Sequence, residues 1–253
     1  MFKGFSKKFI KVKKGKIFCR VGGKGYPLLL LHGYPQTHLM WHKTVSQLSK
    51  SFRVIVADLR GYGSSLTLKS DTKHLNYSKR EMAKDMIQLM SKLGYKKFFI
   101  AGHDRGGRVA HRLARDFRKK VIAMSVLDIC PTLDMYEKTD RNFAKAYFHW
   151  FFLIQPKWFP EKIIKTDPRK WMKSCLDKWS GNHKFGKVEQ EYLKSFKKIK
   201  KYEEPEIDQS INSIAESRLR YETLRKKRKP PEIFEKNNSG LAGILAVSKR
   251  IKD

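Results

Sequence analysis

The stretch that decides the fold is Gly-His-Asp-Arg-Gly at residues 102–106, a turn between a strand and a helix with an aspartate at its apex. It follows an apolar run of strand type at residues 97–101 and precedes a helical pattern at residues 107–114. Glycines on both sides of the apex let a strand turn sharply into a helix, so that Asp104 stands exposed above the sheet. A serine there would attack a carbonyl. A carboxylate is better suited to displacing a halide from saturated carbon, or to opening an epoxide, with an ester as the intermediate.

Other segments form strand-then-turn units in a fixed order along the chain. A continuous apolar run at residues 28–31 is typical of a buried parallel strand and ends in His-Gly-Tyr-Pro at residues 32–35. A second apolar run at residues 53–57 also ends in a glycine-containing loop. This order predicts an α/β-hydrolase fold, a mostly parallel sheet flanked by helices. In that fold the backbone N–H groups of Tyr34 and Arg105 would form an oxyanion hole.

Two further segments lie on either side of the elbow in the sequence. Ser78, followed three residues later by Glu81, predicts a capping box at the start of a helix that runs up to Gly94. After the elbow helix, residues 121–127 have a strand pattern and end at Asp128. A carboxylate at the end of a strand is well placed to orient a catalytic histidine. A surface or helix-capping role for Asp128 is the alternative.

Two arginines follow the apex at positions that share a helix face. Arg105 and Arg108 lie three residues apart at the start of the predicted helix. Their guanidinium groups and the helix N-terminus should keep Asp104 ionised, as a nucleophile requires, and should form a planar fork for a second carboxylate. A small anionic substrate is therefore predicted. The alternative is that one or both arginines point to solvent on a basic protein.

Together these motifs resemble those of haloacetate dehalogenases of the fluoroacetate-cleaving type, over roughly residues 1–196. The most particular feature is arginine directly after Asp104, where haloalkane dehalogenases and epoxide hydrolases of this superfamily typically carry tryptophan. The resemblance implies that Asp104 is the nucleophile, that Arg105 and Arg108 bind the substrate carboxylate, and that Asp128 is the acid of the triad. It implies hydrolysis of fluoroacetate or chloroacetate to glycolate and halide through an aspartyl ester. The alternative is an epoxide hydrolase or another α/β hydrolase with an aspartate nucleophile.

From about residue 133 the pattern becomes helical and rich in aromatic residues. The resemblance makes His149 and Trp150 the pair that binds halide through imidazole and indole N–H donors, which would stabilise a departing anion. Taken alone, the two residues would be core aromatics. We therefore expect an α/β-hydrolase core at residues 1–132, a helical cap at 133–196 and a divergent basic tail at 197–253.

The sequence after the expected cap shows neither further core strands nor the glycine–histidine turn that would carry the catalytic base, and its last histidine is His183. Tyr202 and Tyr221 lack the context of the family's third halide donor. We expect a truncated or frameshifted C-terminus, or else a diverged tail with its own packing, and hence no base histidine. His103 is expected to point away from the apex and His32 to belong to the oxyanion turn. A catalytically incomplete relative is therefore a second hypothesis.

Composition limits the remaining classes. The 253 residues carry a formal net charge of +32, from 56 Lys and Arg against 24 Asp and Glu, spread along the whole chain. Because no nucleic-acid module is recognisable, a solvated basic surface is favoured over nucleic-acid binding. No run approaches the roughly 18 apolar residues of a membrane span, and no signal peptide is visible, which predicts a cytoplasmic protein. Three scattered cysteines suggest neither disulfides nor a metal site. We expect no cofactor and no metal, a small haloacid as the partner, and leave a homodimer open.

Overall fold

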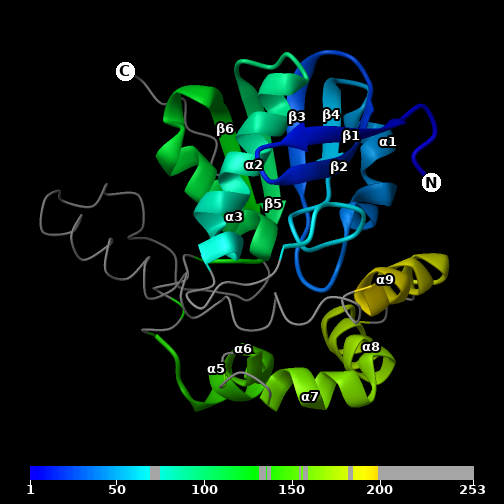
Figure 1. Ribbon diagram of the computed structural model, residues 1–253, viewed down its shortest axis with the longest axis vertical. Coiled ribbons are helices and arrows are strands. Elements are labelled where there is room, and N and C mark those ends of the chain that lie inside the picture. The colour runs from blue at the N-terminus through cyan, green and yellow to red at the C-terminus, as the bar shows by residue number, and fades with distance from the viewer. Residues whose placement is uncertain are drawn as a thin grey trace, which may run out of the picture.

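The computed structural model describes residues 1–68, 75–130, 135, 138–153, 155, 159–181 and 185–198 (Figure 1). Its centre is a six-stranded sheet with the strand order β1-β2-β4-β3-β5-β6. The antiparallel strands β1 and β2 form one side of this sheet, and the pairs β3–β4, β3–β5 and β5–β6 are parallel. The strands are β1 (Ser6–Val12), β2 (Gly15–Gly22), β3 (Tyr26–Leu31), β4 (Phe52–Ala57), β5 (Phe98–His103) and β6 (Val121–Leu127). The predicted α/β-hydrolase fold is confirmed.

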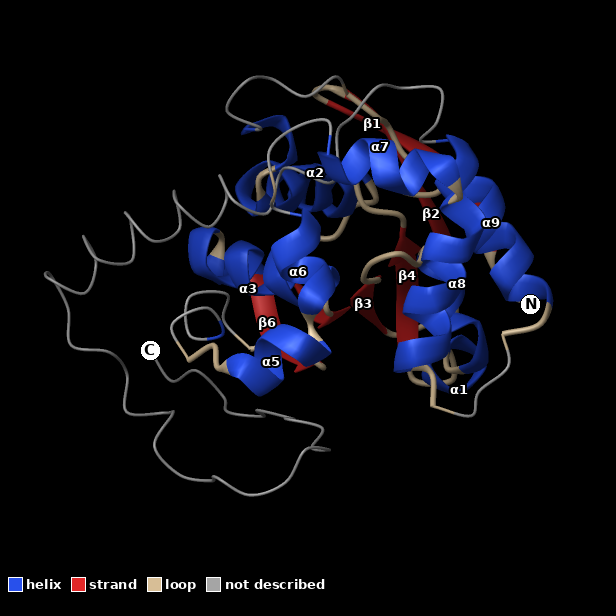
Figure 2. Cartoon of the chain, turned by 90° about the horizontal axis from the view of Figure 1, so that it is seen from below, coloured by secondary structure: helices blue, strands red, loops and turns tan. Residues whose placement is uncertain are grey.

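The described helices fall into two groups. The first group intervenes between the strands in sequence and comprises η1 (His38–Lys43), α1 (Val45–Leu48), η2 (Leu75–Tyr77), α2 (Lys79–Lys92), α3 (Arg105–Asp116) and η3 (Arg118–Lys120). The second group, which we call the helical segment, comprises α5 (Arg141–Ala146), α6 (Phe148–Leu153), α7 (Phe159–Thr166), α8 (Pro168–Trp179) and α9 (Lys187–Lys198). Seen from below, the helical segment lies in front of the sheet, with β3 and β4 visible between α6 and α8 (Figure 2).

Apolar residues are buried on both faces of the central strands. Leu29 and Ile55 pack into a cluster with residues of α2 and α3, whereas Leu30 and Val56 pack into a second cluster with residues of η1, α1, α8 and α9. A parallel strand covered on both faces needs apolar side chains at every position. This explains why the run Leu28-Leu29-Leu30-Leu31 does not alternate with polar residues.

Helix α2 begins with half of the predicted capping box. The Ser78 hydroxyl accepts a hydrogen bond from the Glu81 backbone N–H at 3.3 Å. The Glu81 carboxylate does not complete the box. It pairs instead with Lys84 at 2.6 Å and with Lys14 at 3.4 Å, and the Ser78 backbone N–H donates to the Leu75 carbonyl oxygen at 3.1 Å.

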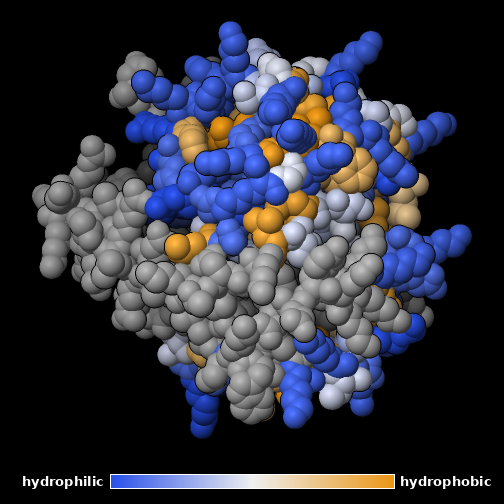
Figure 3. Space-filling model, viewed as in Figure 1, coloured by the Kyte–Doolittle hydropathy of each residue, from blue (hydrophilic) through white to orange (hydrophobic). Residues whose placement is uncertain are grey.

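The predicted division into core, cap and tail agrees in outline with these positions and remains a prediction. Every described strand lies before Asp128, and the helical segment occupies the range expected for the cap. Apart from residues 197 and 198, the predicted tail lies outside the described residues, as do His183, Tyr202 and Tyr221. None of the described helices is long and apolar enough to cross a membrane. Hydrophilic side chains cover much of the described surface around β1 and α2, in keeping with the net charge (Figure 3).

Candidate active site

The predicted elbow is present, with Asp104 at its apex between β5 and α3. Asp104 has φ +46° and ψ −113°, a conformation that L-residues rarely adopt. The flanking glycines are required by close packing: a Cβ on Gly102 would lie 2.3 Å from the Gly106 carbonyl oxygen, and one on Gly106 would lie 2.6 Å from the His32 carbonyl oxygen. The strained backbone holds the carboxylate at the edge of the sheet where the parallel strands end.

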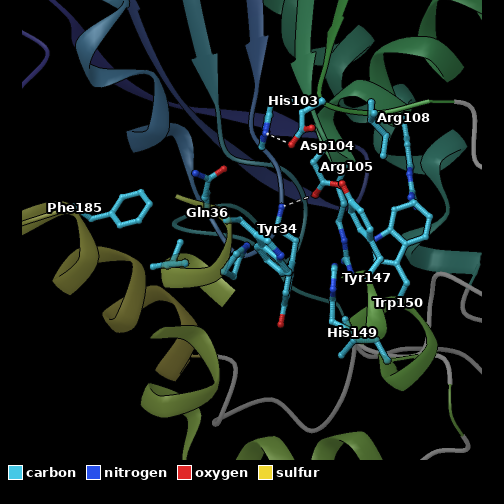
Figure 4. Close-up of a pocket in the computed structure, with 16 residues that line it drawn as sticks. Tyr34, Gln36, His103, Asp104, Arg105, Arg108, Tyr147, His149, Trp150 and Phe185 are labelled. Carbon is cyan, nitrogen blue, oxygen red and sulfur yellow. Dashed lines mark hydrogen bonds and ion pairs between the residues drawn. The ribbon is translucent and has the colours of Figure 1, made fainter. Parts of the chain in front are cut away.

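The Asp104 carboxylate is oriented by the turn after β3. The Tyr34 backbone N–H donates a hydrogen bond to Asp104 Oδ2 at 3.0 Å (Figure 4). Gly33 makes this approach possible, because a Cβ there would lie 2.7 Å from the Asp104 Cβ. The N–H predicted for an oxyanion hole therefore already contacts one oxygen of the expected nucleophile.

Positive charge keeps Asp104 ionised. Burial alone would raise the pKa of its carboxyl, but Arg108, followed by His103, the Tyr34 N–H and Arg105, outweighs burial and lowers the pKa below its ordinary value. A carboxylate that is buried and still ionised is a competent nucleophile at neutral pH.

Both predicted arginines line the same cavity as Asp104. Arg105 Nη1 donates to the Tyr62 hydroxyl at 2.9 Å, and the Arg105 guanidinium carbon lies 4.8 Å from the centre of the Tyr34 ring. The Arg108 guanidinium carbon lies 4.0 Å from the centre of the Trp150 ring. The alternative that Arg108 points to bulk solvent is therefore wrong. Aromatic faces leave the planar edges of a guanidinium available to a carboxylate.

His149 and Trp150 reach the cavity from α6, on the side opposite the sheet (Figure 4). His149 is buried, its ring centre lies 4.3 Å from that of Trp179, and its Nδ1 makes no hydrogen bond with any of the described residues. Burial is the main reason why the pKa of His149 falls to about 4; Asp104 opposes the shift, and nearby cations add to it. The imidazole is therefore neutral at physiological pH and carries one N–H donor.

Asp128 and His103 meet at the same cavity. Asp128 follows β6 directly, has φ +53°, and its carboxylate Oδ2 lies 3.6 Å from His103 Nε2. The expectation that His103 points away from the apex was wrong, because His103 also lines the cavity. The missing side chain of Gly33 leaves room for it: a Cβ there would lie 2.9 Å from His103 Nδ1. The structure thus brings Asp128 to an imidazole that the sequence did not suggest.

His32 belongs to the oxyanion turn, as predicted. It is buried, its Nε2 accepts from the Leu59 backbone N–H at 3.0 Å, and its Nδ1 lies 2.9 Å from the Gly33 carbonyl oxygen. These partners require the neutral tautomer with its proton on Nδ1. Burial lowers the pKa of His32 to about 4, which agrees with that tautomer. Both ring nitrogens of His32 therefore bind main-chain groups, and the residue stabilises the turn.

Sequence reasoning missed several residues at the cavity, Tyr147 among them. Its ring stacks on Phe143 with 4.7 Å between ring centres and 12° between planes, and its hydroxyl points toward Asp104 in Figure 4. Burial raises the pKa of Tyr147, and the charges of Asp128 and Asp104 raise it further. The phenol therefore stays protonated and remains a donor. The sequence feature that could have indicated Tyr147 as a cavity residue is its position two residues before His149.

The cavity has a volume of about 370 Å³ and is walled by both the core and the helical segment. Its size suits a small organic acid rather than a polymer. Within the described ranges, no group of three or more His, Cys, Asp or Glu residues is arranged to hold a metal ion.

The family model described as the alpha/beta hydrolase fold matches residues 26–227. The chain therefore belongs to the α/β-hydrolase family.

Among its relatives, the fluoroacetate dehalogenase of Burkholderia sp. is 44% identical over 198 residues, which are 78% of this chain and 65% of that protein. The soluble epoxide hydrolase of Corynebacterium sp. strain C12 is 43% identical over 111 residues, or 44% of this chain and 37% of that protein. A solved α/β hydrolase from Nostoc sp. PCC 7120 superposes with a TM-score of 0.79 at 43% identity, covering 90% of this chain and 79% of the other. The chain thus spans less than two thirds of the length of the fluoroacetate dehalogenase and of the soluble epoxide hydrolase.

Proposed function

We propose that this chain cleaves the carbon–halogen bond of a small haloacid such as chloroacetate or fluoroacetate, with Asp104 as the nucleophile. The observation that carries the proposal is the presence of Asp104, Arg105 and Arg108 on the wall of one small cavity. A nucleophilic carboxylate beside two guanidiniums suits a substrate that is itself an anion. The similarity to the fluoroacetate dehalogenase supports the same reaction.

In the proposed complex, Arg105 and Arg108 bind the substrate carboxylate. Two carboxylates in one cavity repel each other, and the two guanidiniums offset that repulsion. They also direct the α-carbon of the substrate toward Asp104. Placing the reacting atoms in contact accounts for part of the expected rate increase.

The first chemical step is then a displacement at the α-carbon. One oxygen of Asp104 forms a bond to this carbon while the carbon–halogen bond breaks, and the halide leaves with the bonding electron pair. The other oxygen stays on the Tyr34 N–H. The N–H groups of His149 and Trp150 stabilise the departing halide. The proposed product of this step is an ester of Asp104 with glycolate.

Hydrolysis of this ester needs a base that activates water for attack on the Asp104 carboxyl carbon. In the described part of the cavity wall, the imidazoles are His103 and His149. His149 is a weak base because its pKa is about 4, and the Nδ1 of His103 is buried. We therefore propose that the 253-residue chain performs the displacement and accumulates the ester. This deepens the hypothesis of a catalytically incomplete relative.

The helical segment is proposed to act as the cap. Its residues His149, Trp150 and Trp179 form the side of the cavity that faces the elbow. By covering Asp104 it would reduce the access of water and strengthen the attraction between the arginines and the substrate.

Substrate choice tests this function. The purified chain is incubated with chloroacetate, with the neutral haloalkane 1-chloropropane, and with an epoxide of similar size. We expect close to one equivalent of chloride from chloroacetate and at least ~100-fold slower release from the haloalkane, because an arginine without its carboxylate partner costs about 3 kcal/mol. Asp104→Asn is the control and should release none. Equal rates with the haloalkane, or consumption of the epoxide alone, would overturn the haloacid proposal.

A further inference from the structure

Tyr34 contacts the site in three different ways. Its backbone N–H donates to Asp104 Oδ2 at 3.0 Å, and its ring lies 4.8 Å from the Arg105 guanidinium carbon. Its hydroxyl accepts a hydrogen bond from Trp171 Nε1 at 2.8 Å. Tyr34 belongs to the turn after β3, whereas Trp171 is in α8 of the helical segment. A single buried residue therefore contacts the nucleophile through its backbone, and the first arginine and a helix 137 positions away in the sequence through its side chain.

The hydrogen bond to the Tyr34 hydroxyl affects the position of the Arg105 guanidinium through the Tyr34 ring. A tyrosine ring and its hydroxyl move as one rigid plane, so the hydrogen bond from Trp171 restricts rotation of the whole ring. The Arg105 guanidinium lies against that ring and also donates a hydrogen bond to the Tyr62 hydroxyl at 2.9 Å. If the hydrogen bond from Trp171 is lost, the ring can rotate, and the surface that supports the guanidinium changes.

Trp171 is itself fixed by the helix that carries the predicted halide donors. Its ring centre lies 5.0 Å from that of Phe152 and 6.2 Å from that of Phe148, both in α6. His149 lies between these two phenylalanines in the sequence. The position of the Trp171 ring therefore depends on how α6 and α8 pack against each other.

We propose that the hydrogen bond between Tyr34 and Trp171 couples two positions: that of the helical segment relative to the elbow, and that of the Arg105 guanidinium in the cavity. Tyr34 is thus a positioning residue for the anion site, beyond the backbone N–H that it contributes. The proposal rests on the proposed function only in taking Arg105 as a ligand of the substrate carboxylate.

Two substitutions isolate this hydrogen bond. Tyr34→Phe removes the hydroxyl and keeps the ring and the N–H, and Trp171→Phe removes the indole donor and keeps an aromatic ring beside Phe152. The dissociation constant of acetate, an unreactive carboxylate, is measured by calorimetry for the unchanged chain, both single variants and the double variant. Tyr26→Phe is the control, because Tyr26 is exposed at the start of β3.

Each single variant should weaken acetate binding about fivefold, the scale of one hydrogen bond. The double variant should be weakened by about fivefold as well, and not by the product of the two effects, because both changes remove the same bond. Unchanged acetate affinity in Tyr34→Phe, or additive effects in the double variant, would overturn the coupling.

Amide hydrogen exchange provides a readout that needs neither acetate nor chemistry. In Tyr34→Phe, exchange should increase in α8 and at residues 33–36, and stay unchanged in α2. A general loss of stability would raise exchange in α2 as well, and no increase in α8 would contradict the proposal. If the unchanged chain binds acetate but releases no halide, the proposed function fails while the coupling can still be judged from acetate binding and exchange.

Discussion

At the scale of single residues, the position of Asp104 depends on a neighbour that has no side chain. Gly33 lies against both Asp104 and His103, and a Cβ there would be 2.7 Å from the Asp104 Cβ and 2.9 Å from His103 Nδ1. The Asp104 Cβ is attached directly to the strained elbow backbone, so it cannot rotate out of the way. The glycine of the turn at residues 32–35 is therefore required by the packing of the nucleophile.

Gly33→Ala should slow the release of chloride from chloroacetate at least ~100-fold, because displacement of a reacting group by about 1 Å is enough to cost that factor. Single-turnover chloride release measures the effect. Lys50→Ala, at an exposed site, is the control and should match the unchanged chain. Release by Gly33→Ala within twofold of the unchanged chain would contradict the described contact.

Local sequence was sufficient to place Asp104, Arg105 and Arg108, because all three lie within one strand–turn–helix unit whose geometry the glycines define. It could not find Tyr62 or Trp171. Their contacts with Arg105 and Tyr34 join residues 43 and 137 positions apart, and no periodicity in the sequence reports such pairs. His103 was predicted wrongly for the same reason, since the space it occupies is provided by Gly33.

At the scale of elements, helix α2 shows which interactions local patterns predict well. Its start follows Ser78, as the sequence indicated, and Met82, Met86 and Met90 face the core. The predicted ends of other elements differ by a few residues. Helix α3, for example, spans Arg105–Asp116, whereas the helical pattern in the sequence covered residues 107–114.

Ser78→Ala should lower the free energy of unfolding by about 1 kcal/mol, since the Glu81 N–H loses its capping acceptor. Chemical denaturation monitored by circular dichroism measures the change. Ser91→Ala makes the same substitution near the other end of α2, where Ser91 is exposed, and should be neutral or stabilising by up to about 0.5 kcal/mol. Equal destabilisation by both variants would argue against a capping role for Ser78.

At the scale of the whole molecule, two buried imidazoles link stability to pH. The pKa values of His32 and His149 are both lowered from 6.5 to about 4, chiefly by burial. As the pH falls below 6.5, both imidazoles take up protons in the unfolded chain, whereas in the folded chain they remain neutral until about pH 4. Protonation therefore favours the unfolded state across this window.

The melting temperature should fall steadily between pH 6.5 and pH 4, with each histidine contributing roughly 3 kcal/mol to the loss. Differential scanning calorimetry across this range measures it. In His149→Gln one of these two imidazoles is gone, so the loss of stability between pH 6.5 and pH 4 should be smaller by roughly 3 kcal/mol. A melting temperature that stays constant down to pH 4 would contradict the assignment of neutral, buried imidazoles.

Attack by Asp104 on the α-carbon is tested most directly by weighing the intact protein after incubation with chloroacetate. We expect the added mass of one carboxymethyl group, located on Asp104 by peptide mapping, absent from Asp104→Asn, and removed by hydroxylamine because it is an ester. Hydroxylamine also separates it from alkylation of the exposed Cys130, whose thioether would remain. An Asp104 that stays unmodified while no more than one equivalent of chloride is released would contradict covalent displacement, whereas chloride release well beyond one equivalent would show that the ester does not accumulate.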